Sequence, residues 1–196
     1  MRAGFGRAHC TFMRQNGGRP GALVAMILSG AVLCCALPAS AQDEPRLIPE
    51  VTDYKKLLPV LPEPPEGWKA EPAEGSTDDV GETQIATVHR DYVKGEGDGA
   101  FITSISILDS IANPGYVEAT TSAWTSNTSD ANGYTKSITV DEMPGFETFE
   151  NEGKHGTLWL IVAKRYILQI ESTGQDASEL QNWLKRIDLK KLAEVK

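Results

Sequence analysis

One short run constrains the fold of this chain more than any other segment. Between Thr157 and Ala163 the sequence places five large apolar residues in a row: Leu158, Trp159, Leu160, Ile161 and Val162. The run is far too short to cross a membrane, and successive side chains of a strand point to opposite faces of a sheet. We therefore expect a strand that is covered on both of its faces.

Alternating patterns predict further strands around this run. Thr83 to Val93 is rich in β-branched residues, and Ala100 to Asp109 places its apolar residues at every second position. The Gly-rich turn from Lys94 to Gly99 joins these two strands into a hairpin. Shorter extended segments are expected at residues 68–72, 134–140, 146–151 and 166–171.

Three segments are predicted to be helical. A short helix runs from Asp53 to Leu58 with Thr52 as its cap, and a second begins at Asn113-Pro114 and ends near Asn127. The third begins with a capping box formed by Asp176 and Glu179, and its buried stripe is Leu180, Trp183, Leu184 and Ile187. A looser helical tail follows from Asp188 to Lys196. This order predicts an α+β fold, a mostly antiparallel sheet with helices on both faces, which is a three-layer α/β/α sandwich.

Residues 1–41 have the organisation of a cleavable secretory signal. Arginines come first, and the apolar core from Ala22 to Leu37 is shorter than the roughly 18–20 residues of a spanning helix. Pro38 ends this core, and Ala39-Ser40-Ala41 supplies the small residues expected before a cleavage site. We therefore predict a periplasmic or secreted protein, released after Ala41. An uncleaved membrane anchor is the alternative.

The cysteines and the charges separate this leader from the rest of the chain. Cys10, Cys34 and Cys35 all lie in the leader, so the mature chain is predicted to have no disulfides and no thiolate chemistry. The leader carries four arginines and no acid, and the other 15 basic and all 27 acidic residues give residues 42–196 a charge of −12. Such a charge argues against binding to nucleic acid or to an anionic membrane surface.

Two parts are expected within residues 42–196. Residues 42–66 form a Pro-rich N-terminal segment with the short helix, and residues 67–196 form the α+β domain. The apolar residues of the first part favour packing against the domain, and a free tether is the alternative.

Several local motifs are similar to those of a known superfamily. They are the Pro65-Glu66-Gly67-Trp68 entry, the strand starts at Gly133-Tyr134 and Gly145, the Tyr166-Ile167-Leu168 strand and the closing helix from Leu180 to Leu189. Over residues 55–190 the chain resembles the PsbP-like superfamily, α/β/α sandwiches that include a photosystem extrinsic subunit and small exported lipoproteins. The resemblance implies a binding or assembly module. The lipid-anchoring cysteine of the exported lipoproteins is absent from residues 42–196.

Few residues of the mature chain have the pattern of a catalytic or metal site. Gly95-x-Gly97-x-x-Ala100 precedes a strand, whereas a dinucleotide fingerprint must open a helix. The acidic groups Asp78, Asp79 and Glu82, or Glu96 and Asp98, offer oxygen ligands for calcium without the spacing of an EF-hand loop, and solvated loops are the simpler interpretation.

The histidines give no recognisable catalytic motif either. We expect His89 in a strand beside Asp91, and His155 in a mobile glycine-flanked turn. Asn127-Thr128-Ser129 matches a glycosylation sequon, which has meaning only in a eukaryotic source.

The tryptophans point to binding rather than to catalysis. Trp159 and Trp183 lie in strongly apolar patterns, whereas Trp68 and Trp124 have polar neighbours and are the candidates for lining a ligand or partner groove. We therefore expect an exported non-enzymatic binding or assembly module without a cofactor, whose partner is a protein or small ligand. A hydrolase without a recognisable motif and a structural envelope or stress protein are the alternatives.

The leader generates the first testable prediction. Cleavage between Ala41 and Gln42 is expected because small residues occupy the positions that signal peptidases require. N-terminal sequencing of the exported protein measures this directly. A mature chain that retains Cys34 would contradict both the cleavage site and the absence of thiols.

Overall fold

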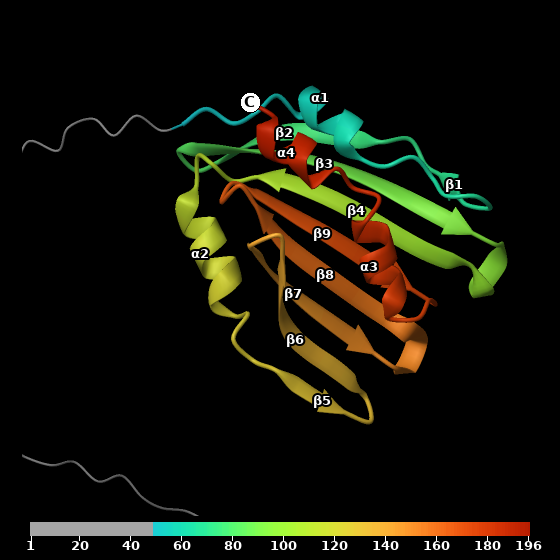
Figure 1. Ribbon diagram of the computed structural model, residues 1–196. Helices are drawn as coiled ribbons and strands as arrows, with labels where there is room; N and C mark the ends of the chain where they lie inside the picture. The colour runs from blue at the N-terminus through green and yellow to red at the C-terminus, as the bar shows by residue number, and fades with distance from the viewer. Residues whose placement is uncertain (1–48) are drawn as a thin grey trace, which may run out of the picture. The chain divides into compact units, whose positions relative to one another are not determined.

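The structure, a computed structural model, describes residues 49–196 apart from the side chain of Asp98 (Figure 1). In this part nine strands form one antiparallel sheet in the order β1-β3-β4-β9-β8-β7-β6-β5, with β2 also paired to β3. The strands are β1 Lys69–Ala70, β2 Glu74–Val80, β3 Thr83–Lys94, β4 Phe101–Asp109, β5 Thr128–Asp130, β6 Gly133–Val140, β7 Met143–Glu150, β8 His155–Val162 and β9 Tyr166–Thr173. The helices are α1 Tyr54–Leu57, α2 Pro114–Ser122, α3 Ser178–Leu184 and α4 Leu189–Glu194, with 3₁₀ turns η1 Leu58–Val60, η2 Gly97–Gly99 and η3 Glu152–Lys154.

Two antiparallel meanders meet at the centre of this sheet. β2, β3 and β4 form the first meander, and the five strands from β5 to β9 form the second. β4 pairs with β9, although α2 and four strands lie between them in the sequence. Ile105 faces Ile170 across this junction and Ile107 faces Leu168, and all four side chains are fully buried.

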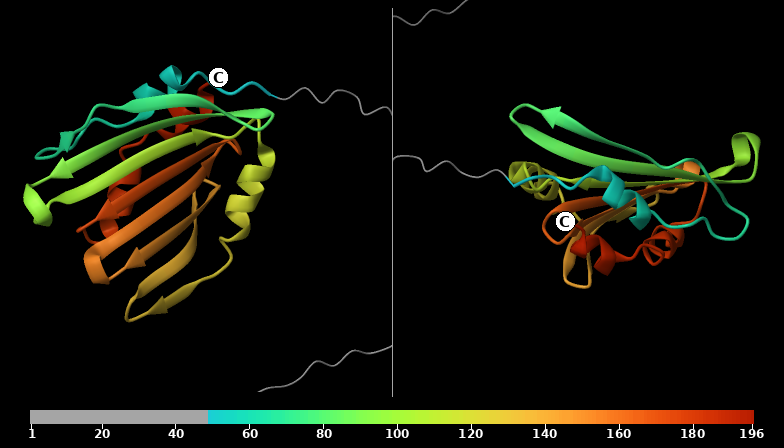
Figure 2. Two further views of the ribbon diagram at one scale, coloured as in Figure 1. Left: turned by 180° about the vertical axis from the view of Figure 1, so that it is seen from behind. Right: turned by 90° about the horizontal axis from the view of Figure 1, so that it is seen from above.

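The two faces of the sheet differ in what covers them. We call the side on which α1, α3 and α4 lie the helix face, and the opposite side the open face (Figure 1 and Figure 2). Because side chains alternate along each strand, Leu160 and Leu168 point to the helix face, whereas Trp159 and Gln169 point to the open face.

The expected three-layer sandwich is wrong, because no helical layer covers the open face in the described part of the chain. α2 lies at one corner of that face, is nine residues long and has no buried residue. The two-faced apolar strand β8 has a simpler explanation. Ile161 and Trp159 form a small apolar patch with Ile167 and Phe146, and α2 and the loop after it are enough to cover such a patch.

The core lies between the sheet and the helices on its helix face. There the predicted stripe of the C-terminal helix is confirmed. Leu180, Trp183, Leu184 and Ile187 are all buried. The ring of Trp183 lies 4.7 Å from that of Tyr92 and 5.1 Å from that of Trp68, measured between centroids. The N-terminal segment packs into the same core through Leu57, Val60 and Leu61.

Both predicted helix caps differ from the observed ones. Asp53 caps α1 by accepting a hydrogen bond from the backbone N–H of Lys55, and Thr52 is buried elsewhere. Asp176 pairs with Lys154 at 2.8 Å, so α3 begins without a side-chain cap. In each case a tertiary partner determines where the side chain lies, and a local pattern does not contain that partner.

α2 is shorter than expected and ends at Ser122. Its last turns are rich in hydroxyl side chains that bond backward to the helix carbonyls: Thr120 donates to Tyr116 O and Thr121 to Val117 O. Ser122 donates to Ala119 O. Such side chains compete with the backbone for hydrogen bonds and weaken a helix interior.

Most strand predictions are confirmed, and two strands, β2 and the short β5, were missed. The β3–β4 hairpin lies where it was expected, and β6, β7, β8 and β9 match their predicted ranges within a few residues. β2 has an exposed, acidic sequence without apolar alternation, so only its backbone pairing with β3 defines it as a strand. Asp78 and Asp79 therefore lie in this strand and not in the expected loop.

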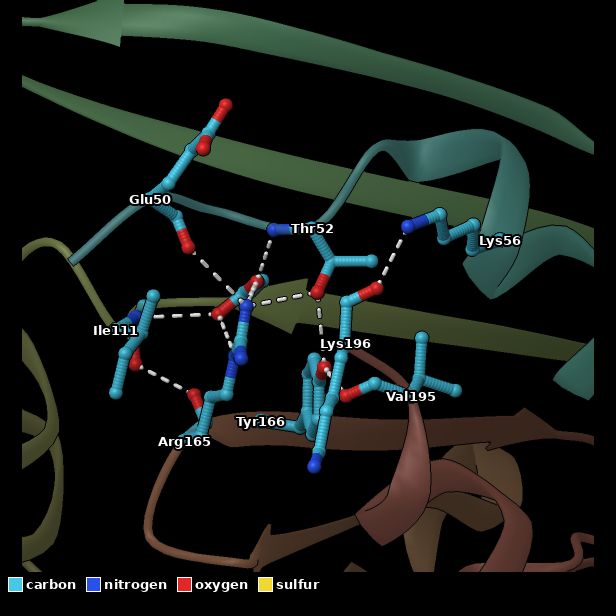
Figure 3. A network of polar contacts seen from close by, with 10 residues as sticks. Glu50, Thr52, Lys56, Ile111, Arg165, Tyr166, Val195 and Lys196 are labelled. Atoms are coloured by element: carbon cyan, nitrogen blue, oxygen red, sulfur yellow. Dashed lines mark hydrogen bonds and ion pairs between the residues drawn. The ribbon is translucent and has the colours of Figure 1, made fainter.

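A buried ion pair ties the N-terminal segment to the sheet (Figure 3). Asp109 at the end of β4 is fully buried and accepts two hydrogen bonds from Arg165, from Nε to Oδ1 at 2.8 Å and from Nη2 to Oδ2 at 2.6 Å. Asp109 also accepts from the backbone N–H groups of Thr52 and Ile111. Four donors therefore compensate one buried carboxylate, and this bond to Asp109 raises the pKa of Arg165.

The C-terminus joins the same network (Figure 3). Arg165 Nη2 donates to Thr52 Oγ1 at 2.7 Å, and Thr52 Oγ1 lies 3.1 Å from the Tyr166 hydroxyl. Since Tyr166 gives its proton to the carbonyl of Val195, Thr52 is the donor to Tyr166. Lys56 Nζ donates to the carbonyl of Lys196 at 2.8 Å. The N-terminal segment and the C-terminus are therefore both fixed at this end of the central strands β4 and β9.

Removing the buried carboxylate should destabilise the domain strongly. Asp109→Ala leaves Arg165 and two backbone N–H groups without their acceptor, which should cost about 3–5 kcal/mol of unfolding free energy. Urea unfolding of the wild type and the variant measures the difference. Asp79→Ala, on the exposed edge strand β2, is the control and should change the value by less than about 0.5 kcal/mol. Equal losses in the two variants would contradict a special role for the ion pair.

Alkaline pH should destabilise the domain through Tyr92. Burial raises the pKa of Tyr92 from 10.0 to about 12. Between these values the unfolded chain ionises this phenol and the folded chain does not, so its contribution is complete below pH 10 and is lost as the pH rises through about 12. The expected loss is about 2–3 kcal/mol of unfolding free energy.

Tyr92→Phe tests this dependence. The variant loses the hydrogen bond to Pro62 O, which should cost about 1 kcal/mol at pH 8, but it should lose less stability than the wild type between pH 8 and pH 11. Tyr116→Phe is the control, because Tyr116 is 43% exposed. Parallel pH profiles for the wild type and Tyr92→Phe would show that another group governs the alkaline loss.

Candidate binding site on the open face

Two rows of mostly polar side chains cross the centre of the open face. The strand register places His89, Ser106, Gln169 and Trp159 side by side in the first row. Asp91, Ser104, Glu171 and Thr157 follow in the same way in the second row. Most of these side chains are half-buried, and they come from the adjacent strands β3, β4, β9 and β8.

His89 connects the two rows through hydrogen bonds. Its Nε2 lies 3.0 Å from Asp91 Oδ1, and its Nδ1 lies 2.9 Å from Ser106 Oγ. Because a carboxylate can only accept, Nε2 carries the proton in the neutral ring, and Nδ1 then accepts from the Ser106 hydroxyl. Ser104 donates to the same Asp91 oxygen. The four side chains therefore hold one another in fixed rotamers.

A serine, a histidine and an aspartate in this order are also the parts of a catalytic triad. The surroundings of Ser106 lack the second component of such a site. β4 lies between β3 and β9, so its backbone N–H groups are directed at neighbouring strands and cannot form an oxyanion hole. The arrangement is better suited to binding hydroxyl or amide groups than to acyl transfer.

His155 lies on the same face but belongs to a separate pair. The expectation of a mobile turn is wrong, because His155 is the first residue of β8 and faces Thr173 of β9. Its Nδ1 lies 3.3 Å from Thr173 Oγ1, and its Nε2 lies 3.6 Å from Glu171 Oε1. The strands β4 and β9 separate it from His89.

The described residues contain no group of three or more His, Cys, Asp or Glu side chains that could hold a metal ion. Asp78 and Asp79 are successive residues of β2 and therefore point to opposite faces. Asp78 accepts from Ser76 and Asp79 accepts from Gln84. Glu96 precedes the turn η2 and is exposed, and the Asp98 side chain lies outside the described part of the structure.

Two hollows flank the His89–Ser106 pair. The first, which we call the α2 hollow, has a volume of about 260 Å³ and lies where Tyr116 and Thr120 of α2 overhang the sheet. Its floor is formed by Leu108, Ile167 and Trp159, and its polar edge by Thr87, Ser106 and Gln169. The second, the β2 hollow, has a volume of about 230 Å³ and is lined by Glu74, Gly75, Ser76, Thr87 and His89. Thr87 lines both hollows, so the two are neighbours.

The structure does not bring the two predicted groove residues together. Trp68 lies on the helix face, where its ring contacts that of Trp183 edge to face. Trp124 stacks on Phe146, which points to the open face, with 6.2 Å between ring centroids. Trp68 does line a separate hollow of about 510 Å³ beside α3, the Trp68 hollow, whose other walls are largely charged: Glu66, Glu179, Lys185 and Arg186.

Sequence reasoning missed Ser106, Gln169 and Trp159 as site residues, although a usable signal was present. In β4, Ser104 and Ser106 alternate with the buried Ile105 and Ile107, and in β9, Gln169 and Glu171 alternate with the buried Leu168 and Ile170. Two central strands with one polar face each indicate a sheet face that solvent or a ligand covers. Trp159 gave no such signal, because its neighbours along the chain are all apolar.

Comparison with protein-family models, with curated proteins and with solved structures found no match to this chain. The resemblance to the PsbP-like superfamily therefore stays a prediction. None of the helices among residues 49–196 has the length and apolar character needed to span a membrane. The predicted leader and its cysteines lie outside the described residues, and the described part contains no cysteine.

Proposed function

We propose that this protein is an exported, non-enzymatic binding module that holds its ligand on the open face, at the α2 hollow. The observation that carries the proposal is the coincidence of a hollow with ordered polar side chains on a sheet face that, among residues 49–196, only α2 overhangs at one corner. The export of the domain rests on the predicted leader, residues 1–41.

Rigid strands make this face a suitable binding surface. The polar groups project from the central strands of the sheet, and His89, Asp91 and Ser106 are already oriented by bonds to one another. Ligand binding therefore costs little side-chain conformational entropy, because the site is already ordered. The charge of −12 on residues 42–196 favours neutral or cationic ligands over phosphates.

A hydrolase is the second candidate, and one observation favours it: the Ser106–His89–Asp91 chain of contacts. The strand pairing of β4 counts against it, because it leaves no backbone donors to stabilise an oxyanion at Ser106. An assembly role without a small ligand would need a partner that covers the open face.

A thermal-shift screen of small neutral molecules tests the proposal. A ligand that raises the melting temperature of the exported protein should lose most of this effect in Trp159→Leu, which keeps an apolar side chain beside Phe146 but removes the indole. Trp68→Phe, on the helix face, is the matched control and should respond like the wild type.

Two results would overturn the proposal. Ligand effects that survive in Trp159→Leu and disappear in Trp68→Phe would move the site to the Trp68 hollow. Hydrolysis of an ester such as p-nitrophenyl acetate that both Ser106→Ala and His89→Gln abolish would favour the hydrolase. Circular dichroism of each variant shows whether it keeps the native fold.

A further inference from the structure

The α2 hollow is lined entirely by uncharged residues, although the protein is strongly acidic. Five of its lining side chains carry a hydroxyl or amide that both donates and accepts: Thr87, Ser106, Tyr116, Thr120 and Gln169. A charged ligand would find no counter-ion in this hollow. Ser106 and Thr120 already donate to His89 and to Tyr116 O, but their oxygens can still accept, so a purely apolar ligand would leave hydrogen-bonding capacity of the lining unused. The lining therefore fits a neutral ligand with many hydroxyl groups.

Aromatic side chains supply the second half of this chemistry. Trp159 lines the floor of the α2 hollow, and Tyr116 overhangs it from α2. The faces of aromatic rings carry negative charge, and they attract weakly positive C–H groups. A pyranose ring presents such C–H groups on its flat faces and hydroxyl groups around its rim, so the indole and the surrounding polar groups match it together.

The size of the site sets the length of the ligand. At about 260 Å³ the α2 hollow is smaller than the roughly 300–1,000 Å³ of sites for drug-sized ligands, which suits a single ring. The β2 hollow adds about 230 Å³ on the other side of Thr87. Its Ser76 and Glu74 side chains offer hydrogen-bond acceptors for the hydroxyl groups of a second ring, and the His89 ring forms part of the wall.

We infer that the open face binds a neutral oligosaccharide, with one ring on Trp159 in the α2 hollow and the next ring beside His89 in the β2 hollow. The inference rests on the proposed function and names its ligand class. Thr87, which lines both hollows, lies between the two rings. Asp91 and Ser106 engage both ring nitrogens of His89, so this ring is held in a fixed position as a packing surface for the second sugar.

Titration calorimetry with defined sugars tests the inference. The probes are glucose, maltose, cellobiose and N,N′-diacetylchitobiose, each added to the exported protein at concentrations up to ~10 mM, which detects even weak binding. At least one disaccharide should bind ~10-fold or more tightly than glucose, because only a disaccharide reaches both hollows.

Variants separate the two hollows. Trp159→Leu should weaken every sugar by ~10-fold or more, and His89→Asn should weaken the disaccharide more than glucose, so that the advantage of the disaccharide is lost. Trp68→Phe should bind all sugars like the wild type, since Trp68 lies on the opposite face.

The outcomes also separate this inference from the proposed function. If no sugar binds, but other molecules stabilise the wild type and not Trp159→Leu, the ligand class is wrong and the binding site stands. If sugars bind equally well to Trp159→Leu, the location is wrong. If Trp159→Leu affects no ligand of any class, both proposals fail.

Discussion

The buried ion pair between Asp109 and Arg165 is the interaction on which the rest of the structure depends. It joins the end of β4 to the turn between β8 and β9, and it holds Thr52 of the N-terminal segment through both its backbone and its side chain. The Asp109 carboxylate also accepts from Ile111, at the point where the chain leaves β4 toward α2. The segment that leads to α2, which overhangs the α2 hollow, therefore starts at the ion pair. The same interaction thus stabilises the fold and positions one wall of the candidate site.

Local patterns in the sequence predicted the elements better than their arrangement. The hairpin of β3 and β4 and the buried stripe from Leu180 to Ile187 follow from periodicity, which records the environment of consecutive residues. The second helical layer was a wrong inference from Leu158 to Val162, because an apolar strand face requires a cover but does not specify which element supplies it. β2 could not be predicted from the sequence, because its pairing with the backbone of β3 makes it a strand and its own side chains show no strand pattern.

In the candidate site, too, local patterns predicted single residues but not how they meet. Strand alternation could have identified Ser106 and Gln169 as members of an uncovered face, and the sequence placed His89 beside Asp91. The contact of His89 with Ser106 and the meeting of Gln169 with Trp159 depend on register between strands. The two tryptophans with polar neighbours, Trp68 and Trp124, were grouped by composition, although they lie on opposite faces of the sheet.

The meeting of two meanders at β4 and β9 has a consequence for how the chain folds. Each meander consists of strands that are neighbours in sequence, so both can form early through short loops. The seam between them brings Ile105 to Ile170 and closes the longest loop of the sheet, which makes it the step with the largest entropic barrier. Asp109 and Arg165 lie at the end of this seam, where a buried charge is tolerated only in one register. The ion pair therefore favours the native register between the two meanders as the seam closes.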